Sequence, residues 1–359
     1  MPGLAGRFAR SRGGSMMPLF FISLVPLVTV VGFSVDYTSA VQTRSNMQQA
    51  LDAATLAITT LPKTTALAAR QQMLQDTFAA NGGQGTATLV SFTIAANGTA
   101  TAQASASFAM PTDFMQIARI DTVPVGVTSA VNKAAALVQT TFKIEKASGW
   151  WDKTMYLYGT RFGSTTKQKL MQISYVYNKG GDPKGYGTTT VSTVSGTTLT
   201  QVQQQVCNTT AVANFNNTPS GAITSTDGNG VMRQTVCTTT PANSTGAVID
   251  VSQMDQLYLE MDVPSAATAK PAQPTTLRSN DPNTSNRLYI GTSPTDMPEI
   301  ATGQTVDIFT AVPCGQTGYQ AWEDGGSAVP APVVNADFFY TVMGKCDFNQ
   351  RPSQTVLTQ

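Results

Sequence analysis

The N-terminal part of the chain contains one long run of apolar residues. No residue from Gly13 to Val35 carries a charge, and twelve of the seventeen residues from Leu19 to Val35 are Leu, Ile, Phe or Val. As a helix, the residues from Met16 onward would extend about 30 Å, which matches the hydrocarbon core of a bilayer. Proline within the run does not oppose this, because transmembrane helices tolerate proline better than soluble helices do. The pattern predicts a transmembrane helix over residues 15–35.

Apolar residues with helical spacing follow this run. They recur at intervals of seven, four, three, four and three residues, at Ala40, Met47, Leu51, Ala54, Ile58 and Leu61. These intervals place all six on one face of a helix. We therefore expect the membrane helix to continue into an amphipathic stem that ends at Pro62.

A second helix is predicted after Pro62. Thr64 or Thr65 is the expected N-cap, and Asn81-Gly82-Gly83 is the expected end. One side of this helix would carry Leu67, Leu74 and Phe78. We interpret the apolar stripes of both helices as core packing rather than as part of a cofactor site.

Two β-like runs come next, Thr86–Ala95 and Thr99–Met110, joined by Ala96-Asn97-Gly98. Asn-Gly supplies the positive φ angles of a tight hairpin. Residues 111–120 are predicted to form a short helix, and Thr122–Val131 a third strand. This order of elements predicts a compact, pilin-like α+β module over residues 36–138.

The remaining chain, residues 139–359, reads as a β-rich domain. Gly, Asn, Pro and Ser clusters separate its short β-like runs. These runs are Thr140–Lys146, Thr154–Gly159, Leu170–Tyr177, Gly187–Val194, Gly246–Val251, Gln256–Val263, Arg287–Ile290, Thr305–Thr310 and Ala336–Met343. Many short strands indicate a β-sandwich whose strand order the spacing leaves open. The predicted fold class is α+β, with a mainly β C-terminal domain.

Composition argues against several classes of function. The chain has 22 Lys and Arg against 21 Asp and Glu, so no excess charge points to a nucleic acid. It has no histidine, which removes Ser-His-Asp catalysis and every zinc site that uses histidine. Neither a GxxxxGK[ST] loop nor a GxGxxG turn after a strand is present. We therefore predict a protein that is not an enzyme and has no resident cofactor.

Charges on the two sides of the apolar run predict its orientation. Arg7, Arg10 and Arg12 precede it without an acidic residue, and Asp36 is the first charge beyond it. Positive residues favour the cytoplasmic side, so residues 1–14 are the expected cytoplasmic tail and the rest is exported. The alternative is a cleaved signal peptide, with Thr38-Ser39-Ala40 as the cleavage site.

All four cysteines, Cys207, Cys237, Cys314 and Cys346, lie in the part predicted to be exported. Disulfides are favoured there. Of the three connectivities we favour Cys207 with Cys237 and Cys314 with Cys346, each closing a loop of about thirty residues. A four-cysteine zinc site is the alternative, but the chain has no CxxC spacing.

Two further groups are candidate binding sites. Trp150, Trp151 and Trp322 could form a platform for a surface glycan, although aromatic residues at strand edges usually pack in cores. Asn280-Asp281-Pro282-Asn283 and Glu323-Asp324-Gly325-Gly326 offer oxygen ligands for calcium between two loops. Asx and Gly residues also form turns without a metal, which is the competing interpretation.

Two segments of the chain resemble a known family. They are RSRGGSMMPLFFISLVPLVTVVGFSVDYTSAVQTRSNMQQALDAATLA and, further on, MPTDFMQIARIDTVPVGVTSAV. Together they look like the TadE/TadG-like proteins of the tight-adherence (Flp) pilus system, over roughly residues 7–132. The resemblance implies a single-pass inner-membrane protein that acts in pilus assembly or surface attachment and contacts other pilus-assembly or pilin subunits.

Two features depart from this family. Members cut by prepilin peptidase carry Glu five residues after the glycine, whereas Leu19 stands five residues after Gly14. Longer members carry a von Willebrand A-type domain with a DxSxS metal motif. The nearest match here is Asp250-Val251-Ser252-Gln253-Met254, in which methionine replaces the second serine. We therefore expect neither pilin-type processing nor that metal site.

These observations predict a membrane-anchored, non-enzymatic component of Flp-type pilus assembly or adhesion. Its partners would be the lipid bilayer, pilus subunits and a surface glycan, and its β-rich domain would lie in the periplasm or at the cell surface. The alternatives are a minor pilin-like subunit of a filament and a secreted carbohydrate-binding or hydrolytic β-sandwich.

Overall fold

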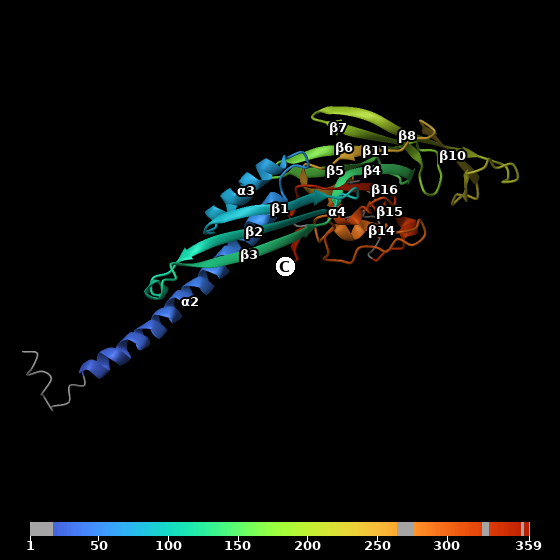
Figure 1. Ribbon diagram of the computed structural model, residues 1–359. Coiled ribbons are helices and arrows are strands. Elements are labelled where there is room, and N and C mark those ends of the chain that lie inside the picture. Colours follow the sequence, from blue (N-terminus) through green and yellow to red (C-terminus); the bar gives the residue numbers. More distant parts are fainter. Residues whose placement is uncertain (1–16, 264–275, 325–329, 353–354, 359) are drawn as a thin grey trace, which may run out of the picture. The chain divides into compact units, whose positions relative to one another are not determined.

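The structure is a computed structural model that describes residues 17–263, 276–324, 330–352 and 355–358 (Figure 1). The chain divides into two units. The first contains residues 1–95, 99–134 and 352–359, and the second contains residues 96–98 and 135–351. Each unit has its own hydrophobic core.

The first unit is built on α2 (Met17–Ile58), a continuous helix of 42 residues. This confirms that the apolar run continues into the stem. The predicted face is buried from Met47 onward, with Leu51, Ala54 and Ile58 fully covered. Leu61 lies beyond the end of the helix.

The second helix, α3 (Leu67–Ala80), differs from the prediction at its start. Its N-cap is Ala66, which makes no side-chain cap hydrogen bond, so neither Thr64 nor Thr65 caps it. Leu67 is exposed, and the buried face instead carries Arg70, Leu74 and Phe78. The predicted helical spacing is correct, but Arg70 rather than Leu67 occupies the first buried position. The helix ends at Asn81 as expected.

Within the described residues, the first unit has a four-stranded antiparallel sheet of order β1-β2-β3-β17. Its strands are β1 (Thr86–Ile94), β2 (Ala100–Pro111), β3 (Thr122–Lys133) and β17 (Thr355–Leu357). The first three were predicted. A short 3-10 helix, η1 (Met115–Ala118), lies between β2 and β3.

Small side chains allow the helices to lie close to this sheet. In β2 the alternate residues Ala100, Ala102, Ala104 and Ala106 are buried and the residues between them are more exposed. Ala102, Ala104 and Ala106 of this row share one core with the packed half of α2 and with α3. Every second residue of the strand therefore packs against the buried faces of the two helices.

The second unit contains the remaining two sheets. One has eight strands in the order β13-β12-β5-β6-β7-β8-β10-β9, and the other has five in the order β11-β4-β16-β15-β14, counted over the described residues. All strand pairs within these sheets are antiparallel. The strands are β4 (Ala136–Ala147), β5 (Lys153–Arg161), β6 (Lys167–Tyr177), β7 (Gly187–Ser195), β8 (Thr198–Ala211), β9 (Ile223–Thr226), β10 (Met232–Thr240), β11 (Ala247–Asp250), β12 (Met254–Asp262), β13 (Thr276–Arg278), β14 (Leu288–Gly291), β15 (Thr317–Trp322) and β16 (Phe338–Asp347).

One hydrophobic core takes residues from both sheets, among them Phe142 of β4, Leu157 of β5, Ile173 of β6 and Tyr340 of β16. The unit is therefore sandwich-like, which confirms the predicted fold class. The described part of this unit also contains the short helices η2 (Ser285–Arg287), α4 (Ile308–Ala311) and η3 (Val333–Asn335).

The longest strand of this unit, β8, was not predicted, because polar residues occupy positions on its buried face. Gln203 is buried, and its side-chain amide accepts from the Ile144 N–H at 3.1 Å and donates to the Ile144 carbonyl oxygen at 2.9 Å. This pair of bonds satisfies a polar side chain inside the fold. Prediction of a strand depends on alternating apolar residues, and a buried glutamine interrupts that alternation.

Two further predictions need correction. Thr305–Thr310 is not a strand: the Asp307 side chain accepts from the Phe309 N–H at 2.9 Å and caps the short helix α4 instead. The predicted domain of residues 139–359 also differs at its C-terminal end, because Thr355–Leu357 pairs with β3 in the first unit. Pairing between strands so far apart leaves no local sequence signal.

The structure contains both disulfides in the favoured pairing, Cys207 with Cys237 and Cys314 with Cys346. Cys207 and Cys237 lie directly opposite each other on β8 and β10. Cys346 lies on β16, and Cys314 forms an isolated bridge with Gly344 of the same strand. Each disulfide therefore joins neighbours within one sheet.

Candidate functional site

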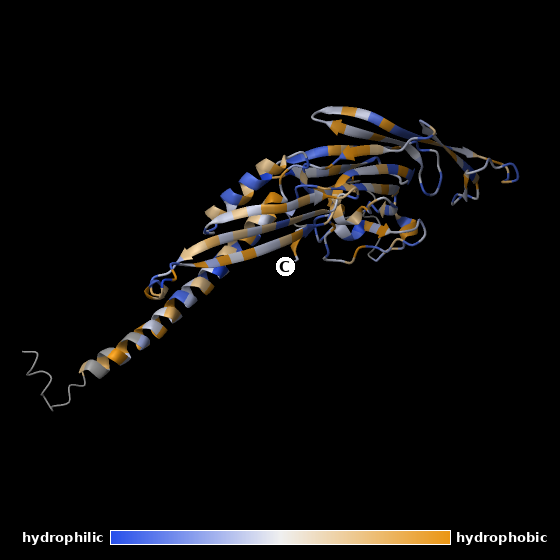
Figure 2. Cartoon of the chain, in the orientation of Figure 1, coloured by the Kyte–Doolittle hydropathy of each residue, from blue (hydrophilic) through white to orange (hydrophobic). Residues whose placement is uncertain are grey.

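The first half of α2 is an exposed apolar surface. Large apolar side chains along it are mostly uncovered, including Phe20, Ile22, Leu27, Val30 and Val31. Figure 2 colours the chain by hydropathy. Within the described residues, α2 is the one helix long and apolar enough to cross a membrane by length and composition. An apolar surface of this extent is typical of membrane or protein contact. The helix is compatible with a single-pass membrane anchor.

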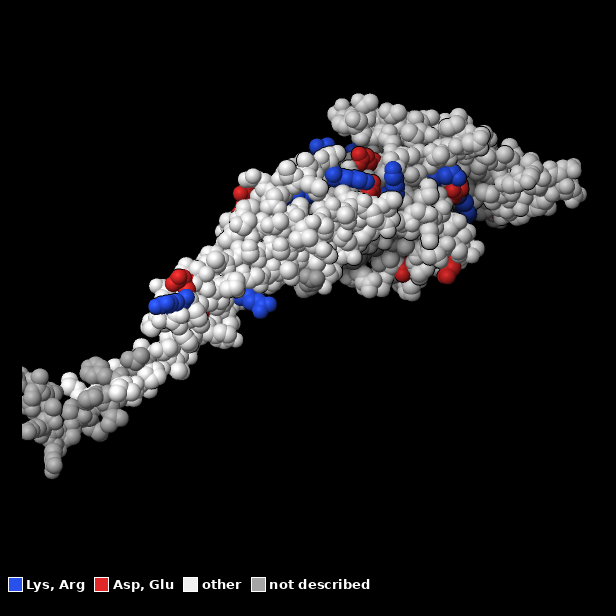
Figure 3. Space-filling view, in the orientation of Figure 1, with Lys and Arg blue, Asp and Glu red and all other residues white. Residues whose placement is uncertain are grey.

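Charge is sparse on the folded part. In Figure 3, the charged residues are few; some Lys and Arg lie close to Asp or Glu, others stand alone, and wide uncharged areas separate them. A nucleic-acid site needs Lys and Arg gathered on one face. The face in view has no such concentration, in keeping with a formal net charge of +1.

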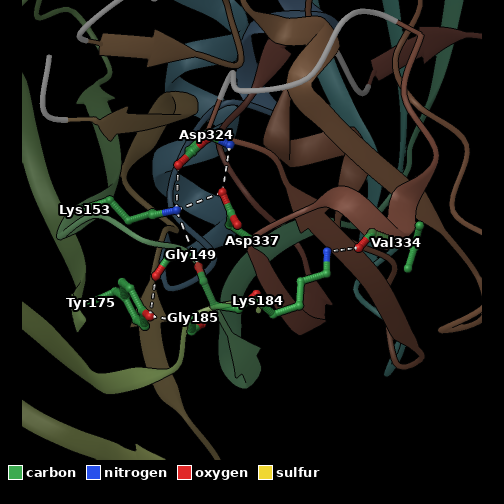
Figure 4. A network of polar contacts seen from close by, with 9 residues as sticks. Gly149, Lys153, Tyr175, Lys184, Gly185, Asp324, Val334 and Asp337 are labelled. Carbon is green, nitrogen blue, oxygen red and sulfur yellow. Dashed lines mark hydrogen bonds and ion pairs between the residues drawn. The ribbon is translucent and has the colours of Figure 1, made fainter. Parts of the chain in front are cut away.

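The most concentrated polar chemistry lies inside the second unit, around Lys153 at the start of β5 (Figure 4). The Lys153 ammonium lies 2.8 Å from Asp324 Oδ2 and 2.8 Å from Asp337 Oδ2. It also donates to the Ser148 carbonyl oxygen at 3.4 Å. The Lys153 side chain is fully buried, and both carboxylates are nearly so. We call these three charged residues the lysine cluster.

The backbone holds the lysine cluster from both sheets of the second unit. Asp337 directly precedes β16, where its N–H donates to the Trp322 carbonyl oxygen at 3.0 Å and its own carbonyl oxygen accepts from the Ser148 N–H at 2.9 Å. Gly149 has a φ of +124°, and a Cβ there would collide with the Lys153 ammonium. A glycine is therefore required beside the lysine.

Burial and mutual attraction set the charges in the lysine cluster. Burial alone would lower the pKa of Lys153, but the carboxylates of Asp337 and Asp324 raise it above its ordinary value. Burial raises the pKa of Asp337 to about 6, although the charge of Lys153 opposes this. An ammonium held by two carboxylates is an ion-pair link between β5 of one sheet and the start of β16 of the other.

The structure brings together only part of the candidate calcium ligand set. Glu323, Asp324 and Asp337 have ligand atoms within 4.8 Å of one another, but Asp281 is not part of this group. The Lys153 ammonium lies where a cation would bind Asp324 and Asp337. Asp281 instead accepts from the Asn283 N–H at 2.9 Å, as in an Asx turn. Gly325 and Gly326 lie outside the described residues.

The three tryptophans do not form one surface. Trp322 is fully buried in the sandwich core, so it is not part of a binding platform. Trp151 is half-buried, whereas Trp150 is 47% exposed and contacts Tyr177 edge-on at 5.6 Å between ring centroids. Trp322 ends β15 with its side chain in the core, where aromatic residues pack rather than bind.

Sequence reasoning missed a groove on the outer face of the five-stranded sheet. It has a volume of about 830 Å³, and its lining includes Tyr319, Phe339, Thr341, Met343 and the Lys143–Glu145 ion pair. Phe339, Thr341 and Met343 are alternate residues of β16, and their neighbours Phe338, Tyr340 and Val342 are buried. The sequence signal that could have indicated this groove is that β16 carries apolar residues on both of its faces.

Comparison with known proteins agrees with the resemblance over the N-terminal helix. Residues 14–57 match a family model described as putative Flp pilus-assembly TadE/G-like. Searches of curated proteins and of solved structures each found no match to the chain. The match associates the N-terminal segment, and with it nearly all of α2, with Flp pilus assembly.

Proposed function

We propose that this protein is a membrane-anchored, non-enzymatic component of Flp-type pilus assembly or surface adhesion. One observation carries the proposal. The segment that matches the pilus-assembly family coincides with α2, whose first half is exposed and apolar and whose second half is built into the core of the first unit. A single helix would thus connect a bilayer to a folded domain.

Two further observations support export of the folded part. Arg7, Arg10 and Arg12 precede the apolar run, which favours a cytoplasmic N-terminus. All four cysteines form disulfides, which persist in an oxidising compartment such as the periplasm. The proposed location is the inner membrane, with both units on the periplasmic or outer side.

The proposed partners are the lipid bilayer and other pilus-assembly or pilin subunits. The groove beside Tyr319, Phe339 and Met343 is the candidate contact surface for such a subunit, because it combines apolar side chains with the polar Thr341. A surface glycan is a second candidate ligand, at the exposed ring of Trp150.

The test is the intact mass and N-terminal sequence of the protein from membrane and extracellular fractions. A full-length species confined to membranes supports the anchor. A cut near Gly14 would identify a minor pilin-like subunit instead, and a cut after Ala40 a secreted protein. Deletion of the gene should also abolish the pilus or attachment, and normal pili and attachment would contradict the proposed role.

A matched pair of variants sharpens this test. Leu27→Arg places a charge in the exposed apolar half of α2, where insertion would become less favourable by about 3 kcal/mol. Leu67→Arg makes the same change at an exposed position of α3. The proposal requires that Leu27→Arg reduce the membrane-bound fraction and that Leu67→Arg leave it unchanged.

A further inference from the structure

The loop between β2 and β3, residues 112–121, carries apolar side chains on its surface. Ile117 is 65% exposed, Ile120 45% and Phe114 37%. In Figure 1 the loop lies beside α2. A short loop that exposes three large apolar residues calls for a partner surface.

The loop is fastened to α2 by one buried acidic residue. The Asp36 carboxylate accepts from the N–H groups of Asp113 at 3.1 Å, Phe114 at 2.9 Å and Met115 at 2.6 Å. One turn earlier on the helix, Gly32 leaves room for the Phe114 side chain, since a Cβ there would lie 2.5 Å from the Phe114 Cβ. The loop therefore has a defined position along α2.

Internal hydrogen bonds satisfy much of the loop backbone. The N–H groups of Ile117, Arg119 and Ile120 donate to the carbonyl oxygens of Phe114, Gln116 and Met115 at 2.8–3.1 Å. The Thr112 N–H donates to the Asp121 carbonyl oxygen at 3.0 Å and closes the base of the loop. Together with the bonds to Asp36, this pairing suits a segment that leaves bulk water, because unpaired backbone groups oppose that transfer.

The loop contacts α2 where its uncharged run ends. Asp36 is the first charged residue after Gly13. The next residue, Tyr37, is 68% exposed, and tyrosine is enriched where a transmembrane helix leaves the bilayer. Arg119, Asp113 and Asp121 are exposed in the same loop and could remain among headgroups or water. The loop thus lies at the level expected for the bilayer surface.

We propose that this loop docks into the surface of the bilayer that α2 crosses, with Phe114, Ile117 and Ile120 inserted among the headgroups and upper acyl chains. The inference rests on the proposed membrane anchor and adds a second contact to it. A helix alone leaves a domain free to swing about its exit point. A helix and a loop tied by Asp36 hold the first unit at a fixed height and orientation on the membrane.

The test uses single cysteines, which can be labelled selectively because all native cysteines are in disulfides. Leu27→Cys reports on the helix, Ile117→Cys on the loop, and Gln103→Cys, at an exposed position of β2, is the matched control. The full-length variants carry an environment-sensitive fluorophore in vesicles of phosphatidylethanolamine and phosphatidylglycerol. Quenching by lipids brominated on the acyl chain then measures contact with the bilayer, with no other protein present.

The expected result is strong quenching at position 27, intermediate quenching at 117 and none at 103. Quenching at 27 without quenching at 117 would overturn the loop inference and leave the anchor standing; it would also be the outcome if the loop docks a protein. Absence of quenching at both positions would refute the anchor itself.

A second variant tests the tie between loop and helix. Asp36→Ala should reduce quenching at position 117 toward the level of position 103 while position 27 keeps its value. Asp52→Ala, which removes an acidic residue further along the same helix, should change neither. Unchanged quenching at 117 in Asp36→Ala would contradict the assigned role of Asp36.

Discussion

The two units bury cations in opposite ways. In the first unit, Lys133 donates to the Thr59 carbonyl oxygen at 2.8 Å and Arg70 donates to the carbonyl oxygens of Ile58 and Pro62, at and just beyond the C-terminal end of α2. In the second unit, Lys153 is held by the carboxylates of Asp324 and Asp337. The first arrangement neutralises the partial charge at a helix end, and the second neutralises full charges.

The difference appears in the pKa values. Burial, and then the nearby charge of Arg70, lower the pKa of Lys133 to about 8. For Lys153 the effect of burial is outweighed by two carboxylates, which raise its pKa. A buried lysine beside carbonyl oxygens therefore loses its proton more easily than an ordinary lysine. A buried lysine between carboxylates keeps its proton, and its replacement would leave buried anions without a counter-ion.

Replacement of Lys153 should have the largest effect on stability and is the strongest test of the difference between the two units. Lys153→Met should lower the free energy of unfolding of the second unit by about 3–5 kcal/mol, because two buried carboxylates lose their counter-ion. Urea unfolding followed by tryptophan fluorescence measures it, since all three tryptophans lie in this unit. Lys143→Met, which breaks an exposed pair with Glu145, is the control and should change it by less than about 1 kcal/mol. Equal midpoints for the two variants would refute a stabilising role for the lysine cluster.

Loss of a disulfide should have an effect on stability almost as large, and only in the second unit. Replacing Cys207 and Cys237 together by serine should destabilise the second unit by about 3 kcal/mol, because the bond constrains a loop of about thirty residues in the unfolded chain. Unfolding of the first unit, followed by circular dichroism of α2 and α3, should keep its midpoint. A loss in the first unit alone would contradict the assignment of both disulfides to the second.

The acidic side of the lysine cluster makes a smaller, pH-dependent contribution. Because the pKa of Asp337 is raised from 3.8 to about 6, the folded state binds more protons than the unfolded state between these values. Stability of the second unit should therefore fall as pH rises from about 4 to about 6, by at most about 1.4 kcal/mol per pH unit. Lys153, Asp324, Glu323 and Tyr175 are the titratable groups around this carboxyl. Asp337→Asn should remove this component, and an unchanged pH profile would contradict it.

The smallest effect is expected at Lys133. Lys133→Met loses one hydrogen bond but also removes a costly buried charge, so the free energy of unfolding of the first unit should change by about 1 kcal/mol. The pKa of Lys133 is about 8 when folded and 10.5 when unfolded, so native stability should rise with pH across this window. Circular dichroism in urea at pH 7 and pH 10 should show that rise in the native protein and not in the variant. A rise retained in Lys133→Met would assign it to another group.

Local periodicity carried most of what could be predicted about the first unit. A 3.6-residue stripe and a bilayer-length apolar run define α2, and period-two alternation with Asn97-Gly98 defines β1, β2 and their hairpin. In the second unit the same signal failed where the buried residues are polar. Gln203 conceals β8, and Asp307 turns a strand-like run into a helix cap.

The sequence by itself determined the long N-terminal helix and the α+β class, and the cysteine pairing that we favoured among three connectivities is the one in the structure. Only the tertiary structure decided that Lys153, Asp324 and Asp337 meet, that Trp322 is buried, that β17 pairs with β3 and that Asp36 holds a loop nearly eighty residues away. The physical reason is the range of the interactions. The periodicity of a helix or strand depends on residues that are close in the sequence. Strand order and the burial of charge depend on contacts between residues far apart in the sequence, and the loops that connect them do not specify these contacts.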